Sequence, residues 1–269
     1  MGSEADVLSM ILARKRIEVG RRRRWLDALD AVLNPVPFDA ERGERAVACL
    51  RRGAASVPKV IAEVKFRSPS AGAIRPKPPG EVARVAKGYS EAGAAVVSVL
   101  ADGPGFGGSV LDVRRAAAIT ETPVLFKEFV VDEAQIRWAR AVGASLVLLI
   151  VRALSDDELV ALVDAARRAG LEAVVEAADD AELTRALRSG ATVVGVNARD
   201  LRTFAVDRGA AQKLVERIPA DRVAVSMSGI TSRDAYRALG ASRTDAVLVG
   251  ESLMRAPDPG AELRAWRAA

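Results

Sequence analysis

Residues 59–70 read Lys59-Val60-Ile61-Ala62-Glu63-Val64-Lys65-Phe66-Arg67-Ser68-Pro69-Ser70. An apolar run rich in β-branched residues gives way to charge and then to turn residues, which indicates a buried strand that opens into a loop. Side chains alternate along a strand, so Ile61, Glu63 and Lys65 share one face. Charge at the end of an apolar face is costly as packing but suits the floor of an active site. We therefore interpret this strand as the first of a barrel.

The rest of the chain alternates between strand and helix patterns. After the strand that begins at Lys59, apolar strands are expected at 95–101, 124–129, 146–151, 173–177, 193–197, 223–228 and 246–249. Helices are expected at 81–92, 134–142, 156–169, 180–189, 208–218 and 233–239. Gly-Ala pairs at 93–94, 143–144, 190–191 and 240–241 precede strands, which predicts left-handed glycines that end helices. Eight such units predict an α/β fold, the (βα)8 or TIM barrel, with its chemistry at the carboxyl ends of the strands.

The first 58 residues follow a different pattern. Apolar residues recur at helical spacing over residues 5–34, and Pro35 and Pro37 end this run. A second helix is expected over 38–53, ending at Gly53. We expect residues 1–58 to form a helical extension packed over one end of the barrel, and residues 59–269 to form the barrel itself, the whole being a single domain.

Two residue types are nearly missing, and their scarcity excludes several chemistries. The chain has no histidine, which removes Ser-His-Asp and Cys-His catalysis and the common histidine metal sites. Its single cysteine, Cys49, excludes an intrachain disulfide framework and a thiol cluster for zinc. We therefore expect no metal site, and proton transfer has to use Lys, Glu, Asp, Tyr or Cys.

Charge and hydropathy restrict the partners. The formal net charge of +5 suits an anionic small-molecule substrate. Aromatic residues make up only 4% of the chain, so stacking on nucleic acid is not expected, and the arginines at 21–24 are interpreted as a solvated helix face. No run approaches the roughly 18 apolar residues of a membrane span, and the first residues do not resemble a signal peptide. We expect a cytoplasmic monomer that contacts neither membrane nor nucleic acid.

Charged side chains gather at the predicted carboxyl ends of the strands. By strand parity, Glu63, Lys65, Lys127 and Glu176 all point into the mouth of the barrel. A lone charge at such a place is more often part of a rim salt bridge, but four that converge favour chemistry. In a partly dry pocket, lysine can donate a proton and glutamate can accept one without histidine.

Glycines directly after the last two strands indicate an anion site. Gly229 follows Ser228, the last residue of one strand, and Gly250 follows the other strand, so backbone N–H groups there could hold a phosphate. The alternative is that these are ordinary βα turns that need glycine for their geometry. Ser68 could add a hydroxyl donor.

Two further segments remain open to more than one interpretation. Asn197 and Arg199 could bind polyol hydroxyls and an anion, or Asn197 could cap a turn while Arg199 pairs with Asp200. The glycine-rich stretch 104–109 is interpreted as a flexible loop, plausible as a lid tipped by Phe106, and it lacks the spacing of a dinucleotide motif.

Seven stretches taken together resemble the indole-3-glycerol-phosphate synthase family of tryptophan biosynthesis. They are IAEVKFRSPS at 61–70, FGGS at 106–109, VLFKEFVVD at 124–132, VVE at 174–176, GVNARDL at 195–201, SGI at 228–230 and LVGESLM at 248–254. The resemblance implies a carboxy-lyase that closes the ring of 1-(2-carboxyphenylamino)-1-deoxyribulose 5-phosphate with loss of CO2 and water, without a cofactor.

The resemblance also implies roles for individual residues. Lys127 resembles the general acid and Glu176 the general base of the later dehydration. Lys65 resembles the lysine that holds the substrate carboxylate, and Glu63 and Asn197 resemble groups that orient it and the substrate hydroxyls. The phosphate shell is matched by Ser68, Ser228, Gly229 and Gly250, with Arg199 as a supporting arginine near the mouth.

One departure from the family pattern bears on activity. The family usually has glutamate where this chain has Met227, so a negative neighbour of the amines is lost. We expect this change to slow the reaction rather than redirect it. The alternative is a catalytically degenerate paralogue that binds a phosphorylated ligand without efficient turnover. A related isomerase activity would need a cysteine at the rim, and Cys49 lies outside the predicted strands.

Overall fold

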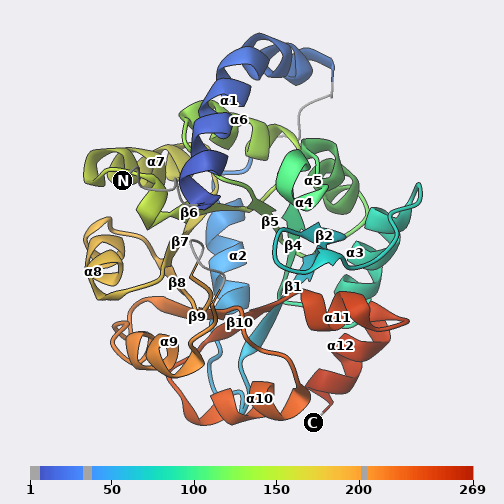
Figure 1. Ribbon diagram of the computed structural model, residues 1–269, viewed down its shortest axis with the longest axis vertical. Helices are drawn as coiled ribbons and strands as arrows, with labels where there is room; N and C mark the ends of the chain where they lie inside the picture. The colour runs from blue at the N-terminus through green and yellow to red at the C-terminus, as the bar shows by residue number, and fades with distance from the viewer. Residues whose placement is uncertain (1–6, 33–37, 201–204, 269) are drawn as a thin grey trace, which may run out of the picture.

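The protein is described from a computed structural model that covers residues 7–32, 38–200 and 205–268, with the side chains of 24–32 left aside. Within these residues, parallel strands close into a barrel in the order β1-β10-β9-β8-β7-β6-β5-β4 (Figure 1). The barrel strands are β1 (Lys59–Val64), β4 (Val96–Leu100), β5 (Val124–Lys127), β6 (Leu146–Ile150), β7 (Glu172–Ala177), β8 (Val193–Asn197), β9 (Val223–Met227) and β10 (Ala246–Val249). The prediction of an eight-stranded TIM barrel is confirmed, and the strand ends agree to within two residues.

Helices follow the strands around the outside. They are α3 (Glu81–Glu91), α5 (Val110–Ala117), α6 (Glu133–Ala141), α7 (Asp156–Arg168), α8 (Asp180–Arg188), α9 (Arg208–Val215), α10 (Arg233–Ala238), α11 (Glu251–Arg255) and α12 (Pro259–Arg267), with short 3-10 turns η1 (Val151–Ala153) and η2 (Leu239–Ala241). The sequence analysis missed α5, α11 and α12, and also the small hairpin of β2 (Arg67–Ser68) and β3 (Gly72–Ala73). Among the described helices, none combines the length and apolar character that a membrane crossing requires.

Glycine ends three of the four helices for which the Gly-Ala pairs predicted it. Gly93, Gly143 and Gly190 have φ of 78°, 87° and 77°, the left-handed conformation in which a side chain is strained. The prediction was wrong at Gly240, which lies within η2 and is not left-handed. A Cβ at Gly240 would collide with the backbone carbonyl oxygen of Ser56, so close chain approach requires glycine there.

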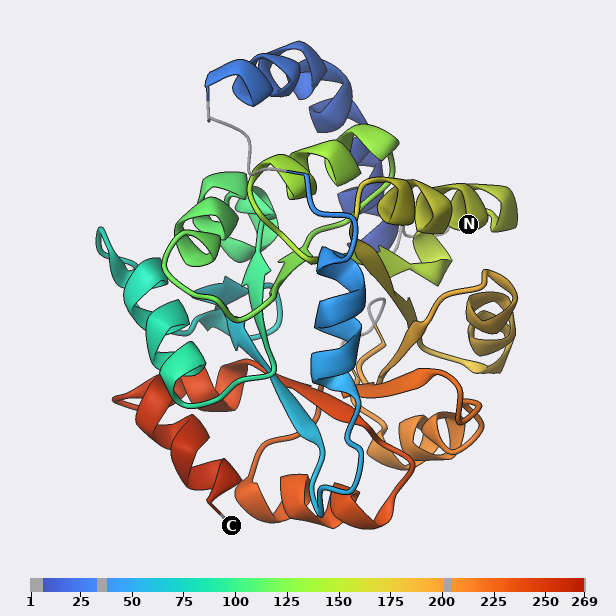
Figure 2. The same ribbon diagram turned by 180° about the vertical axis from the view of Figure 1, so that it is seen from behind.

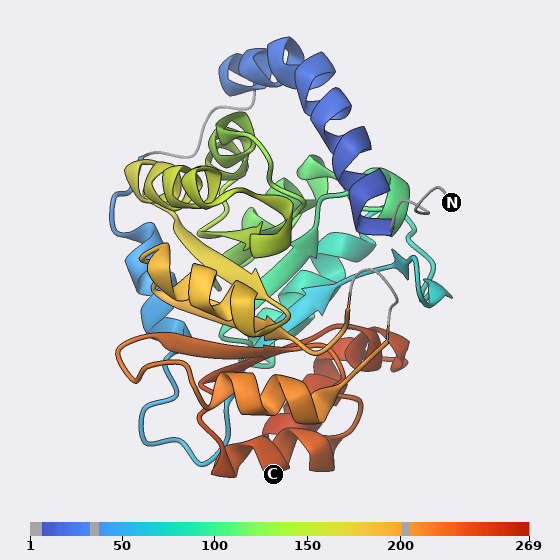
Figure 3. The same cartoon turned by 60° about the vertical axis from the view of Figure 1, so that its left-hand side comes forward.

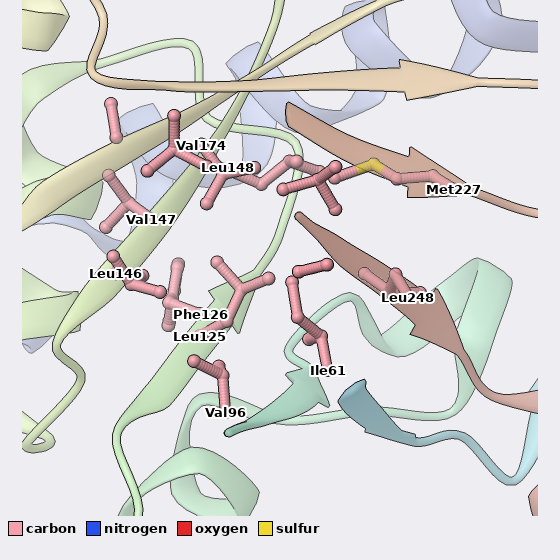
Figure 4. Close-up of a cluster of buried hydrophobic side chains, with 14 of the residues drawn as sticks. Ile61, Val96, Leu125, Phe126, Leu146, Val147, Leu148, Val174, Met227 and Leu248 are labelled. Atoms are coloured by element: carbon pink, nitrogen blue, oxygen red, sulfur yellow. The ribbon is translucent and has the colours of Figure 1, made fainter. Parts of the chain in front are cut away.

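The inside of the barrel is filled by layers of apolar side chains (Figure 4). Ile61, Leu125, Val174 and Val225 come from alternate strands and are fully buried. Each stands two residues before the last inward position of its strand. The layer above them therefore belongs to the carboxyl ends of the same strands.

The two N-terminal helices lie in different places. α2 (Arg42–Leu50) crosses the opening at the amino ends of the strands (Figure 2), where the Gly43 N–H donates to the Gly170 carbonyl. α1 (Val7–Val32) lies at the other end, at the rim formed by the carboxyl ends of the strands, where it packs against α6 and η1 and where Lys15 reaches Asp102 and Glu128 (Figures 1 and 3). The expectation that both helices cover one end was wrong, because α2 lies at the amino ends of the strands and α1 at their carboxyl ends. The predicted helix end at Pro35 and Pro37 lies outside the described residues. The predicted boundary at residue 58 between the helical extension and the barrel stays a prediction.

The contact of α2 with the barrel floor predicts opposite effects for two glycine substitutions. A Cβ at Gly43 would lie 2.5 Å from the carbonyl carbon of Leu171 and 2.6 Å from the backbone nitrogen of Glu172. We expect Gly43→Ala to lower the free energy of unfolding by about 1–3 kcal/mol. Gly20→Ala, at an α1 position with nothing within 4 Å, should raise it by about 0.5–1 kcal/mol. Urea denaturation measures both free energies of unfolding. Equal changes in the two variants would contradict a tight contact between α2 and the amino ends of the strands.

Candidate active site

A pocket of about 1000 Å³ opens at the carboxyl ends of the barrel strands. The barrel fold places it there because the loops after parallel strands all leave from the same edge. It is lined by each of the site residues predicted from the sequence: Glu63, Lys65, Ser68, Phe106, Lys127, Glu176, Asn197, Arg199, Ser228, Gly229 and Gly250. The structure therefore brings the whole predicted set together.

Four side chains form the layer at the bottom of this pocket. Glu63, Lys127, Glu176 and Met227 project from β1, β5, β7 and β9, which are alternate strands of the ring. Met227 is 2% exposed, and its side chain reaches into the barrel interior (Figure 4). It takes the space over Gly195, where a Cβ would lie 2.5 Å from the Met227 methyl carbon. The layer thus holds two carboxylates, one ammonium and one thioether.

The charged groups of the pocket are paired. The Lys127 Nζ lies 3.2 Å from Oε2 of Glu176, and the Asn197 amide donates to Oε1 of the same carboxylate at 2.9 Å. The Lys65 Nζ lies 2.8 Å from Oε1 of Glu63. Both carboxylates are buried, whereas the two lysines keep partial exposure toward the opening. The ammonium groups therefore face the space in which a substrate would lie.

The electrostatic setting of Glu63 keeps it ionised. Burial alone would raise the pKa of its carboxyl, but the nearby Lys65 and Lys127 outweigh this effect and hold the pKa below its ordinary value. A neutral acid is thus not available at this corner. Glu63 acts instead as a fixed negative charge that orients the two ammonium groups.

The turn after β9, across the ring from Lys127 on β5, has the geometry of an anion site. Ser228 and Gly229 have φ of 64° and 75°, so two successive residues adopt the left-handed conformation. Ser228 is the one described residue other than glycine with positive φ, a strained backbone of the kind found at binding sites. Gly250 packs on Glu63, and a Cβ there would lie 2.6 Å from Oε1 of Glu63. Position 250 therefore has to be glycine so that the Glu63 side chain can pack against its backbone.

The structure supports the turn-cap interpretation of Asn197, while binding of polyol hydroxyls and an anion by Asn197 and Arg199 stays a prediction. The Asn197 Oδ1 accepts a hydrogen bond from the Arg199 backbone N–H at 3.0 Å, as a turn cap does, while its amide holds Glu176. Asp200 lies 3.5 Å from the Arg152 guanidinium, and Arg199 lines the pocket.

The segment of Phe106 is partly helical, which the sequence analysis did not expect. The prediction of a loop over 104–109 was wrong for residues 104–106, because Gly103–Phe106 form the short helix α4, capped by the Asp102 carboxylate, which accepts from the Gly105 N–H at 2.7 Å. The flexibility of this segment and its role as a lid stay predictions. The Phe106 ring packs 6.1 Å from the ring of Phe129. An aspartate two residues before a proline is a helix-start signal that could have revealed α4.

Sequence reasoning missed three arginines at the mouth of the pocket. Arg208 and Arg233 are the first residues of α9 and α10, and Arg255 ends α11. The signal available for the first two was their position at the start of the helix that follows a barrel strand, at the same end of the barrel as the pocket. They add positive charge on the side of Ser228 and Gly229.

This arrangement can bind an anion at one side and transfer protons at the other. The left-handed turn, serine hydroxyls and arginines suit a phosphate, and Lys65 suits a carboxylate. Lys127 and Glu176 form a donor and acceptor pair within hydrogen-bond reach of one another. In the described part of the chain, no cluster of three or more His, Cys, Asp or Glu side chains could hold a metal ion.

Comparison with known proteins agrees with this geometry. The family model described as indole-3-glycerol phosphate synthase matches residues 8–266. The chain belongs to this family. The resemblance inferred from the sequence motifs is thereby confirmed.

Relatives in the indole-3-glycerol phosphate synthase family match nearly the full length. The chain is 44% identical over 261 residues to indole-3-glycerol phosphate synthase 2 of Streptomyces coelicolor, covering 97% of this chain and 98% of the relative. It is 41% identical over 259 residues to the indole-3-glycerol phosphate synthase of a Nocardioides species, covering 96% and 97%.

Two solved structures are similar in fold alone. KGPDC of Streptococcus mutans has a TM-score of 0.59 at 13% identity, covering 79% of this chain and 96% of that protein. Thiamine phosphate pyrophosphorylase of Pyrococcus furiosus has a TM-score of 0.56 at 16% identity, covering 79% and 95%.

Proposed function

We propose that this chain closes the ring of 1-(2-carboxyphenylamino)-1-deoxyribulose 5-phosphate to give indole-3-glycerol phosphate in tryptophan biosynthesis. Family membership over residues 8–266 makes it a carboxy-lyase. The observation that carries the proposal is the Lys127 ammonium 3.2 Å from the Glu176 carboxylate in a pocket with an anion site opposite. A donor and an acceptor of protons then flank one bound molecule.

The first step forms a carbon–carbon bond. The ring carbon that bears the carboxylate attacks the ribulose carbonyl carbon, and Lys127 donates a proton to the carbonyl oxygen, which becomes a hydroxyl. The bond to the carboxylate then breaks and CO2 leaves, and its electron pair restores the aromatic ring. Lys65 holds the carboxylate, and Glu63 keeps Lys65 in place by their 2.8 Å ion pair.

The second step removes water. The new hydroxyl leaves with a proton, and Glu176 accepts a proton from the neighbouring methylene carbon, so a double bond forms and the indole is complete. Asn197 holds Glu176 toward the reacting atoms through its 2.9 Å hydrogen bond. Over the cycle two protons are delivered to oxygen, one to the carbonyl and one to the leaving hydroxyl, and Glu176 takes one from carbon. The one net proton comes from water and replaces the charge lost with the carboxylate, and no added cofactor is required.

The phosphate anchors the substrate at the far side of the pocket. We assign it to Ser68, Ser228, Gly229 and Gly250, with Arg199 as a supporting charge and Phe106 as an apolar wall near the ring. We further propose that the protein acts as a cytoplasmic monomer that contacts no nucleic acid.

Turnover of the named substrate tests the proposal. The rise of indole fluorescence, with mass identification of indole-3-glycerol phosphate, would support it. Calorimetric binding of the substrate without any product would contradict it and favour a degenerate paralogue that keeps its anion site.

Met227 gives a gain-of-function prediction. A carboxylate at this corner would add negative charge to a layer in which Lys127 is the one ammonium, and its attraction would help to orient that ammonium for proton donation. We expect Met227→Glu to raise kcat by up to about tenfold and Met227→Gln, which adds a polar group without charge, to leave kcat within about twofold. Steady-state kinetics checks this, and an equal change in the two variants would contradict the electrostatic explanation.

A further inference from the structure

A buried lysine on α1 lies outside the machinery described so far. Lys15 is 1% exposed, and its Nζ lies 2.9 Å from Oδ1 of Asp102 and 3.0 Å from Oε2 of Glu128. It shares a helix face with Leu8, Leu12 and Val19, which are all buried. An ammonium within such an apolar face is costly unless it is paired. Its position thus depends on these carboxylates.

Lys15 is charged in this setting. Burial would lower the pKa of its ammonium, but Glu128 and Asp102 raise the pKa above its ordinary value. Glu18 adds a third carboxylate at 3.0 Å, one turn along α1.

Asp102 connects this lysine to one wall of the pocket. It stands two residues after the end of β4, and its second oxygen accepts from the Gly105 N–H at 2.7 Å and so caps the start of α4. Phe106 ends α4 and lines the pocket. A shift of Asp102 would therefore move Phe106.

Glu128 connects the same lysine to Lys127. It is the next residue along the chain, directly after β5, and although it also lines the pocket, its buried carboxylate pairs with Lys15 on α1. Its Oε1 accepts from the Phe129 N–H at 2.8 Å, and the Phe129 ring meets that of Phe106. The backbone on which Lys127 stands is thus fixed by a contact with a residue 113 positions earlier.

We propose that Lys15 is a positioning residue for the reaction: it ties α1 to the carboxyl ends of β4 and β5 and so fixes Lys127 and the Phe106–Phe129 wall. This inference rests on the proposed function. A purely structural anchor for α1 would affect stability but not the chemical step.

Lys15→Met separates these two roles. We expect kcat to fall by about tenfold to a hundredfold, because misplacement of a proton donor is costly. The inhibition constant of inorganic phosphate should stay within twofold, because the ion pairs of Lys15 go to Asp102, Glu128 and Glu18 and to none of the residues assigned to the anion site. Kinetics is measured at a temperature at which circular dichroism shows the variant folded.

The double variant Lys15→Met with Glu128→Gln keeps the test valid if the single variant folds poorly. It leaves no uncompensated charge at Glu128, while Asp102 keeps Arg14 at 3.2 Å. Stability should recover in part and kcat should stay low. Recovery of both would overturn the positioning role.

Arg167→Met is the matched control at the other end of the barrel. Arg167 pairs at 2.9 Å with Glu172, a buried carboxylate at the start of β7. We expect lower stability with unchanged kcat. If the unmodified chain turns over the substrate and the kcat of Lys15→Met lies within threefold of its kcat, this inference alone is overturned. If the unmodified chain shows no turnover, the proposed function is overturned and this inference with it.

Discussion

Replacing Lys127 with alanine is expected to lower kcat for indole formation by about 10²–10⁴-fold, the usual contribution of a positioned general acid. The physical reason is that Lys127 stands alone as the ammonium in a layer with Glu63 and Glu176, and donates the proton that the attacked carbonyl oxygen needs. Release of CO2 should fall by the same factor, because bond formation precedes decarboxylation. Indole fluorescence and CO2 release, followed in parallel, measure both.

The matched control for this variant is Lys87→Ala. Lys87 is 59% exposed on α3 and lies 3.8 Å from Glu91, so its loss should leave both signals unchanged. Urea unfolding of Lys127→Ala is needed as well, since the substitution leaves the buried carboxylate of Glu176 without its cation. A folded Lys127→Ala protein with kcat within threefold of the unmodified chain would refute the assignment of Lys127.

Glu176→Gln is expected to separate the two chemical steps. Glutamine keeps the shape of the side chain and can still accept a hydrogen bond from Asn197, but it cannot take up the proton in the dehydration. We expect indole formation to fall by about 10²–10⁴-fold and CO2 release to fall much less, so that a ring-closed, hydroxylated intermediate accumulates.

Mass spectrometry of quenched reactions identifies that intermediate. Glu91→Gln, at a side chain 60% exposed, is the control for loss of a carboxylate outside the pocket. If CO2 release and indole formation fell by the same factor, Glu176 would act before decarboxylation, and its role as the base of the second step would be wrong.

Local pattern in the sequence was sufficient for the barrel and for most of the site. Runs of β-branched residues predict strands, and the two-residue period fixes which side chains face inward, so Glu63, Lys127 and Glu176 could be placed in one mouth. Glycine directly after an apolar strand pattern also predicted the turn at Ser228 and Gly229, because such turns need the backbone conformations that glycine adopts without strain. These features depend on neighbours a few residues apart.

The tertiary structure alone decided which groups meet across the ring. Met227 fills the corner over Gly195, and Lys15 lies between Asp102 and Glu128. Neither contact leaves a local signal, because each joins residues whose separation is set by strand register and by helix docking. The sequence determined the direction of each side chain, and the closure of the barrel determined its partner, since closure is a long-range packing event that no short window contains.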